Sequence, residues 1–177
     1  MNTSVKRWMS WEGGVDLIAM TRDGLEQPDV IVHMARVVHT PAGSAASGLI
    51  LLPGDGGQPK LAGFISEDEK VGRYFGPHIF AGTPFENAPV LSGKIEVEIA
   101  APQVARVRVA VEEYSIVSEL RKLGELQRAD RAPGAFPFHD NSLEARADEV
   151  TLTLNGERLD LAGIAVAVWA PCGFYSR

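Results

Sequence analysis

The sequence predicts a mainly β protein, an antiparallel β-barrel or sandwich with one α-helix near residues 116–129. Many short segments alternate apolar and polar residues, which is the period-2 pattern of half-buried strands. Gly, Pro, Asn and Asp separate these segments and indicate turns. Only one segment has helical periodicity, and one helix cannot supply the crossovers that a parallel sheet needs.

The clearest strand pattern lies near the end of the chain. Residues 150–154 alternate Val or Leu with Thr, and Asn155 and Gly156 then suit a tight type I′ hairpin turn. The run 164–169 is apolar at every position, which is typical of a strand covered on both faces. We expect this run to be the central strand of the sheet.

Earlier segments predict further strands in chain order. They cover residues 15–21, 29–40, 48–52, 60–66, 89–101 and 104–113. Strict alternation along 29–40 would place Ile31, His33, Val37 and His39 on one face. The segment 72–85 mixes aromatics with Gly and Pro, so it predicts a rim, a lid or a bulged strand.

The segments 89–101 and 104–113 are expected to pair as antiparallel strands. Val107, Val109 and Val111 would point inward, and the intervening arginines would point outward. The outward arginines could then face the glutamates of 89–101 across the ladder. A solvated charge ladder is the expected role of these side chains.

The helix prediction rests on apolar residues spaced four, three and three apart. These residues are Ile116, Leu120, Leu123 and Leu126, and Ser115 precedes them as a plausible N-cap. The longest irregular segment, 130–141, follows the predicted helix. Loops of this length inside a domain are often functional.

The domain prediction is an N-terminal arm, residues 1–14, followed by a single β-barrel domain over 15–177. Trp8 and Trp11 either pin the arm to the body or cap a pocket. Short strands joined by turns, with one helix, resemble lipocalin-like small barrels in architecture. A barrel of about eight strands can enclose one small ligand, but a shared architecture does not carry function.

Composition excludes several classes of partner. The net charge of −6 disfavours duplex nucleic acid and anionic membrane surfaces, which attract Lys and Arg. The chain has no apolar run long enough to span a bilayer and no signal peptide. Cys172 is the single cysteine, so no internal disulfide can form. We therefore expect a cytoplasmic protein, with Cys172 as a buried, inert thiol.

Candidate catalytic residues are those that could exchange protons in an apolar pocket. His78 and His139 each lie in an aromatic, proline-rich segment, and Glu113 would continue the inward valine series. Tyr74 and Tyr114 could donate hydrogen bonds to a carbonyl or enolate oxygen. Candidate ligand-binding walls are Phe80, Phe136, Phe138 and Trp169. The alternative is that each histidine makes a structural hydrogen bond and that Glu113 reaches solvent.

No metal or cofactor is predicted. His33 and His39 would lie roughly 20 Å apart on one extended strand, and direct ligands to one zinc ion lie at about 2 Å from it. Zinc-type His-Glu-x-x-His and dinucleotide-type glycine motifs are absent from the sequence.

The sequence thus predicts a cofactor-independent enzyme, of isomerase, cyclase or lyase type. It would act on a small, partly apolar carbonyl or aromatic compound by acid–base chemistry in a barrel cavity. One alternative is a small-molecule-binding barrel without chemistry. The other is an accessory or homo-oligomerising subunit whose apolar strands and tryptophan arm pack on another chain.

Overall fold

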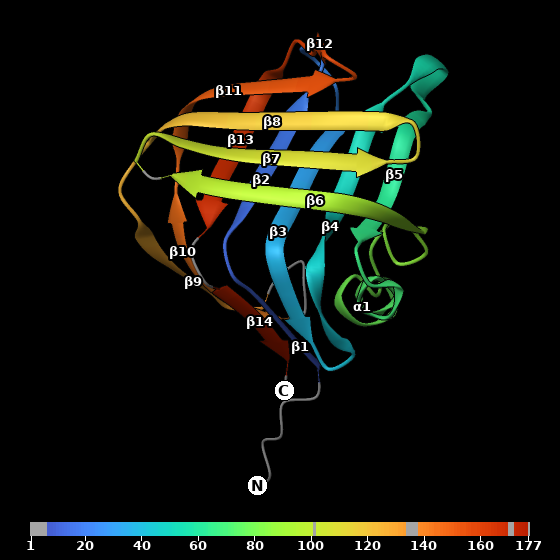
Figure 1. The fold of residues 1–177 in the computed structure, drawn as a ribbon, viewed down its shortest axis with the longest axis vertical. Helices are drawn as coiled ribbons and strands as arrows, with labels where there is room; N and C mark the ends of the chain where they lie inside the picture. The colour runs from blue at the N-terminus through green and yellow to red at the C-terminus, as the bar shows by residue number, and fades with distance from the viewer. Residues whose placement is uncertain (1–6, 101, 134–137, 170–171, 177) are drawn as a thin grey trace, which may run out of the picture.

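The chain forms one large, mostly antiparallel β-sheet that bends into two layers, with one short α-helix (Figure 1). The computed structural model describes residues 7–100, 102–133, 138–169 and 172–176. The mainly β, antiparallel class predicted from the sequence is confirmed.

The strands of the back layer run across those of the front layer in Figure 1. The back layer contains β1 (Arg7–Trp11), β2 (Gly14–Met20), β3 (Val30–Thr40), β4 (Gly43–Pro53), β5 (Pro59–Ser66) and β13 (Ala162–Trp169). The front layer contains β6 (Val90–Ala100), β7 (Val104–Val111), β8 (Tyr114–Leu123) and β11 (Ala147–Leu154). The remaining strands are β9 (Gln127–Arg131), β10 (His139–Ala145), β12 (Glu157–Arg158) and β14 (Cys172–Ser176).

A single parallel pair joins the two layers. Residues 64–66 of β5 pair with residues 90–92 of β6, whereas the other strand pairs are antiparallel. A parallel connection needs a crossover, and helix α1 (Glu69–Tyr74) lies in it. The strand order runs on from β6 through β7, β8 and β11 to β12. Within the described residues this end does not pair with β9 or β10, so the predicted closed barrel is not formed.

The space between the layers is a packed hydrophobic core, where the sequence predicted a barrel cavity. Its fully buried members come from both layers, and we call this group the inner core. They include Val15, Leu17, Val32, Met34, Ile50 and Ile65 from the back, and Val107, Val109, Ile116, Leu120 and Leu152 from the front. Apolar side chains on facing sheets interdigitate in this way in β-sandwiches.

The predicted helix over 116–129 is wrong, because these residues form most of β8, a short link at 124–126 and the start of β9. Inward positions of β8 are Ile116, Ser118 and Leu120, and the polar Ser118 hides the period-2 pattern in the sequence. Lys122 has a positive φ of 54°, after which Leu123 is again buried. The spacing between the buried leucines is therefore three residues, which imitates a helical stripe.

The run 164–169 forms most of β13 but is not covered on both faces. Its strand lies between β2 and β10, and Ile164 is 43% exposed. Gly163 has φ of 54°, and the register with β2 shifts between Ala162 and Ala165. The irregularity turns this end of the strand toward solvent, which an apolar sequence run does not show.

Two local predictions are confirmed. Asn155 and Gly156 have φ of 52° and 85°, as a type I′ turn between β11 and β12 requires. Glu98 lies directly opposite Arg106 on β6 and β7.

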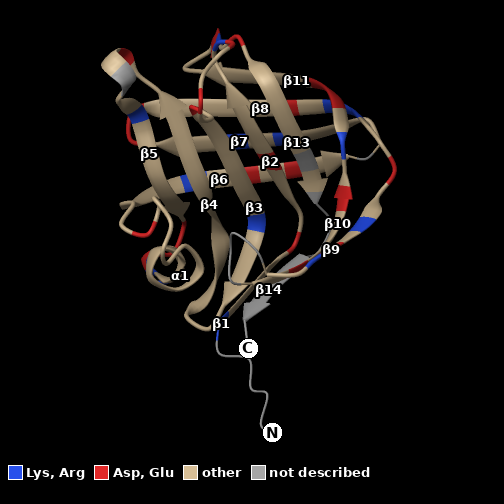
Figure 2. Cartoon of the chain, turned by 180° about the vertical axis from the view of Figure 1, so that it is seen from behind, with Lys and Arg blue, Asp and Glu red and all other residues tan. Residues whose placement is uncertain are grey.

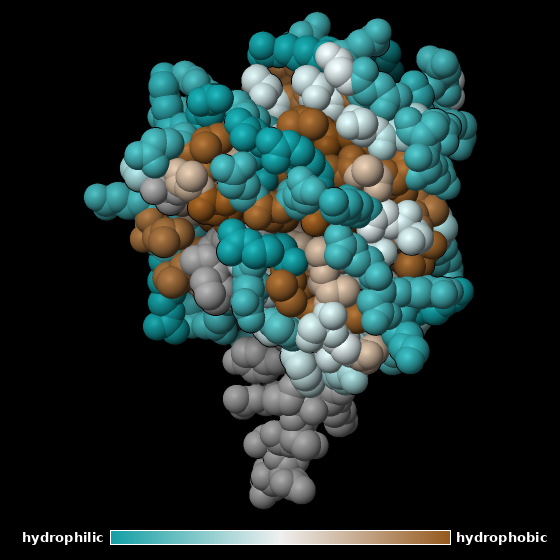
Figure 3. Space-filling model, in the orientation of Figure 1, coloured by the Kyte–Doolittle hydropathy of each residue, from teal (hydrophilic) through white to brown (hydrophobic). Residues whose placement is uncertain are grey.

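The front face of the molecule, seen in Figure 3, is largely hydrophilic with apolar side chains between the charged ones.

The predicted N-terminal arm, residues 1–14, includes β1. This strand pairs with β14 on one side and with β3 on the other. Trp11 is 2% exposed, so it is part of the body of the protein.

Replacing Ser118 with alanine is expected to stabilise the fold. Ser118 is fully buried between Val107 and Leu152, and its Oγ has no hydrogen-bond partner among the described residues. An unsatisfied buried hydroxyl costs about 1 kcal/mol or more, so Ser118→Ala should raise the free energy of unfolding by about 1 kcal/mol. Urea denaturation measures this change.

Ser47→Ala is the matched control. Ser47 is equally buried, but its Oγ lies 2.8 Å from Ser66 Oγ in a hydrogen bond. Its loss should destabilise the protein by about 1 kcal/mol. A Ser118→Ala variant that unfolds as easily as Ser47→Ala would contradict the assignment.

Glu119 is expected to make the stability depend on acid pH. Arg106 Nε and Arg121 Nε each donate a 2.7 Å hydrogen bond to its carboxylate. The hydrogen bond from Arg106, followed by that from Arg121, holds the pKa of Glu119 below its ordinary value of 4.5, against the opposing effect of burial. Because the pKa of Glu119 is lower in the folded than in the unfolded state, its ionised form stabilises the fold above pH 4.5. This stabilisation is lost as the pH falls through the pKa of the folded state.

The comparison of wild type with Glu119→Gln measures this effect. At pH 7 the variant should be less stable, by about 1 kcal/mol or less. The difference in urea midpoint should shrink as the pH falls to about 3. A difference that stays constant between these two pH values would show that Glu119 does not titrate differently in the folded state.

Candidate functional site

A β-bulge in β3 decides which side chains share the outer face of the back layer. Ala35 pairs with Ser47 of β4, and the next pair is Val38 with Ala45, so β3 has one residue more than β4. A bulge of this kind moves the following side chains to the other face. Val38 therefore follows Ala35 on its face, and the predicted common face for His33 and His39 is wrong.

The neighbouring strand has a matching irregularity between β1 and β2. Trp11 pairs with Val38, and Gly14 pairs with Ala35. Three residues therefore separate the two pairs both on β3 and on the segment that joins β1 to β2. Gly13 has φ of 74°, a conformation that glycine adopts at little cost. Trp11 is thereby placed on the same outer face as Val38 and beside His33, whose ring centroid lies 5.9 Å from its own.

A second hydrophobic cluster covers this outer face, and we call it the outer core. Its buried members are Met9, Trp11, Ala35, Val38, Leu49, Phe64, Val71, Tyr74, Phe75, Ile79 and Phe138. Helix α1 and the π-helical turn Phe75–Ile79 supply the covering side chains. Asp68 caps the helix by accepting a 2.8 Å hydrogen bond from the Lys70 amide.

The π-helical turn has a local cause in the sequence. Pro77 has no N–H and so cannot donate an α-helical bond to the Arg73 carbonyl, and the turn is closed by the Phe80 amide, which donates to the Phe75 carbonyl at 2.8 Å. A Cβ on Gly76 would lie 2.4 Å from the carbonyl oxygen of Glu86. Glycine therefore lets the following loop pack against the turn, which brings Phe80 back over the sheet.

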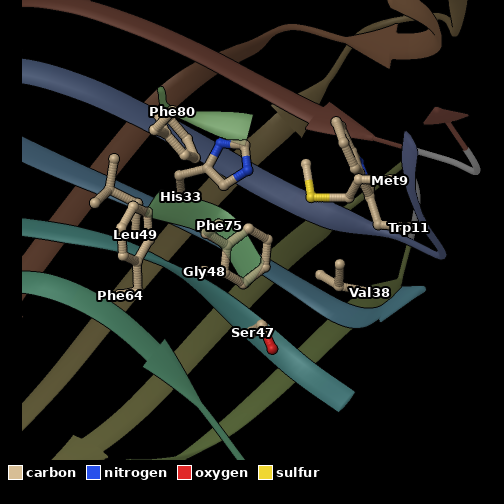
Figure 4. Close-up of a pocket in the computed structure, with 10 residues that line it drawn as sticks. All are labelled: Met9, Trp11, His33, Val38, Ser47, Gly48, Leu49, Phe64, Phe75 and Phe80. Atoms are coloured by element: carbon tan, nitrogen blue, oxygen red, sulfur yellow. The ribbon is translucent and has the colours of Figure 1, made fainter. Parts of the chain in front are cut away.

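An aromatic hollow opens between this turn and the sheet (Figure 4). It is lined by Met9, Trp11, His33, Val38, Ser47, Gly48, Leu49, Phe64, Phe75 and Phe80. The Phe64 ring stacks on Phe75 at 5.5 Å and contacts Phe80 at 5.2 Å between centroids. The enclosed volume is about 10 Å³, which is room for one water molecule.

His33 is the one imidazole among the residues that line this hollow. It lies directly opposite Asp16 on β2, and its Nδ1 is 3.4 Å from Asp16 Oδ1. The two side chains are 22% and 24% exposed. At this distance the carboxylate interacts electrostatically with the imidazole.

Three of the sequence-predicted site residues gather beside the hollow. The His78 ring stacks on Tyr74 at 4.5 Å between centroids, and the Tyr74 hydroxyl accepts a hydrogen bond from the Trp8 amide at 3.4 Å. Arg7 connects this pair to Phe138, since its guanidinium lies 5.7 Å from the Phe138 ring and donates to the His78 carbonyl at 3.3 Å. Phe80, a fourth predicted residue, lines the hollow itself.

Glu113 and Tyr114 lie at a different place, in and after the turn between β7 and β8. The prediction that Glu113 points inward is wrong, because β7 ends at Val111 and Glu113 is exposed in the turn. Tyr114 packs against the inner core. Partial burial, followed by the hydrogen bond with Glu113, raises the pKa of the Tyr114 hydroxyl above its ordinary value.

His139 is half-buried at the start of β10, next to a charged cluster. Arg131 donates hydrogen bonds to Asp140 Oδ2 at 2.7 Å and to both oxygens of Glu144, at 2.6 and 2.8 Å. Burial raises the pKa of Asp140 more than the hydrogen bond from Arg131 lowers it. The cluster joins β9 to β10.

Two predicted wall residues cannot be assigned to the site. Phe136 lies outside the described residues, and for Trp169 only the backbone, in β13, is described. Cys172 is likewise described only as part of β14.

Sequence reasoning missed the His33–Asp16 pair. The two residues are paired only once the register of β2 and β3 is known. The Gly13-Gly14 dipeptide was an available signal for the break between β1 and β2, which places β2 beside β3.

No protein-family model matches this chain, and no curated protein matches it either. Among the described residues, no group of three or more His, Cys, Asp or Glu side chains is placed to hold a metal ion. The described helices are all too short or too polar to cross a membrane.

Proposed function

We propose that this protein binds a small, partly aromatic molecule in the hollow on the outer face of its back layer. The observation that carries the proposal is the gathering of Trp11, Phe64, Phe75 and Phe80 around one space beside His33. Ligand sites typically combine apolar and aromatic walls with a small number of polar groups. The proposal keeps the ligand class predicted from the sequence but moves the site from a barrel interior to the outer face.

The charge distribution of the sheet supports an apolar ligand at this face. Strands β2 to β5 contain three charged residues, Asp16, Arg36 and Lys60, and Figure 2 shows these strands largely free of charge. The front layer carries most of its charges in ladders of Glu and Arg. A ligand with an apolar body would therefore gain free energy by leaving water at this face.

The ligand needs more room than the hollow offers in this state. A volume of about 10 Å³ holds one water molecule, whereas a ring such as toluene needs a site several times larger. Phe80 is the side chain best placed to move, because it is only partly buried and follows the π-helical turn. Phe64 and Phe75, in contrast, are buried in the outer core.

Acid–base catalysis on the bound molecule is the second candidate function. The His33–Asp16 pair favours it, since an imidazole oriented by a carboxylate is a common general base. The exposed His78, stacked on Tyr74, is a further acid–base candidate at the edge of the outer core.

Removing the Phe80 ring is expected to enlarge the hollow and strengthen binding. Toluene should bind Phe80→Ala several-fold more tightly than wild type, because an apolar space lined by aromatics accepts such a molecule. Ligand-observed NMR titration measures both affinities.

Phe85→Ala is the matched control for this experiment. Phe85 belongs to the same segment and its ring contacts Phe80 at 6.1 Å between centroids, but it does not line the hollow. It should leave the toluene affinity unchanged. The proposal fails if no variant binds toluene, or if Phe85→Ala gains as much affinity as Phe80→Ala.

A further inference from the structure

We propose that two copies of this protein associate through their β9 strands, which pair antiparallel with Ala129 on the twofold axis. The inference is independent of the proposed function, because no residue of β9 lines the hollow. Strand β9 is an edge strand, since β10 is the one strand that pairs with it among the described residues. Figures 1 and 2 show β9 at the rim of the molecule.

Contacts to β10 hold this edge in a strand conformation. Strand β9 pairs with β10 from Gln127 to Arg131, and Arg131 donates hydrogen bonds to Asp140 and Glu144 at 2.6 to 2.8 Å. On the side away from β10, the backbone groups of β9 pair with no other strand of the described residues. Such groups can hydrogen-bond to an added strand. A preformed strand also loses little conformational entropy when a second strand is added.

Large apolar side chains are exposed beside the same edge. Among the described residues three are exposed, and two of them lie here. Leu126 is 54% exposed and directly precedes β9, and Leu143 is 41% exposed and lies opposite Arg128 on β10. Apolar surface of this kind favours association, because a second chain removes part of it from water.

The charges of β9 select a second copy of the same strand as the partner. Arg128 and Asp130 share one face, where their side chains lie 3.4 Å apart and are 74% and 58% exposed. Opposite residues of an antiparallel pair share a face, so the twofold axis of a symmetric pair passes through a residue position. With the axis at Ala129, Arg128 of each strand lies directly opposite Asp130 of the other.

The other symmetric registers are unfavourable. An axis at Arg128 places two arginine side chains opposite each other, and an axis at Asp130 places two aspartates opposite each other. An axis at Gln127 or at Arg131 leaves most of β9 unpaired. Opposite charges stabilise a cross-strand pair, whereas like charges destabilise it. The order Arg-Ala-Asp therefore specifies one register for the pair of β9 strands.

Analytical ultracentrifugation from micromolar to millimolar concentration tests whether the dimer forms. Its contact is smaller than the roughly 1,200 Å² of a stable interface, so the dimer should be weak and reversible. Arg128→Asp places two aspartates opposite each other at two positions and should weaken the dimer about tenfold. Adding Asp130→Arg to this variant restores opposite charges in the same register, and should restore the wild-type dissociation constant.

Arg158→Asp is the matched control for the change of charge. Arg158 is an exposed arginine of β12, away from β9 in the strand order. Its replacement changes the net charge by the same amount as Arg128→Asp and should leave the dissociation constant of the dimer unchanged. Circular dichroism confirms that each variant is folded.

A disulfide cross-link tests the register. The single cysteine of the chain is first removed by Cys172→Ser. Directly opposite residues have Cβ atoms about 4.5–5.5 Å apart. Ala129→Cys should therefore cross-link to its counterpart in a second copy when diamide is added as the oxidant. Arg128→Cys and Asp130→Cys, each opposite a different residue, should cross-link much less.

Three results would overturn the inference. The first is a protein that remains monomeric at millimolar concentration. The second is a dimer that Arg128→Asp does not weaken, which would use another surface. The third is a dimer that cross-links as readily through Asp130→Cys as through Ala129→Cys, which would have another register. None of these variants changes the hollow, so the toluene titration remains a separate test of the proposed function.

Discussion

The alternation of side chains between the two faces of a β-strand is the constraint on which this structure depends. An unbroken β3 would send every second residue to the inner core along its whole length. The extra residue between Ala35 and Val38, with its counterpart at Gly13 in the neighbouring chain, resets this alternation. Val38 therefore joins Ala35 on the outer face, where both belong to the outer core.

The two cores give the two faces of the back layer different properties. The inner core is covered by strands on both sides, with tightly packed side chains from both layers. The outer core is covered by one short helix, a single π-helical turn and the loop that contains Phe80. Closely packed interiors respond to a change of even one methylene, whereas Phe80 in the cover of the outer core is only partly buried. The outer face is therefore the place where we propose that a ligand binds.

Electrostatics reinforce this division. Charges of the front layer are mutually compensated, as Glu119 between Arg106 and Arg121 illustrates. The back layer carries few charges, and Asp16 faces an imidazole in the row that borders the hollow. An ion pair or charged hydrogen bond is stronger where less water surrounds it. The His33–Asp16 pair is about as buried as Arg106 and Glu119 of the front layer, and it differs from them in that His33 lines the hollow.

The sequence by itself determined the mainly β class and most strand positions. It also determined the Asn155–Gly156 turn and the facing Glu and Arg residues of β6 and β7. Each of these features follows from a local pattern, either an alternation of period two or a turn. It also pointed to Tyr74, His78, Phe80 and Phe138, whose aromatic segments meet at the outer core or its edge. It misread β8 because Ser118 occupies an inward position and Lys122 shifts the spacing. Only the tertiary structure decided that the layers enclose a packed core and that His33 meets Asp16. Both outcomes depend on strand register and on bulges. These are set by hydrogen bonds between strands that are far apart in the sequence, so the order of residues along one strand gives little sign of them.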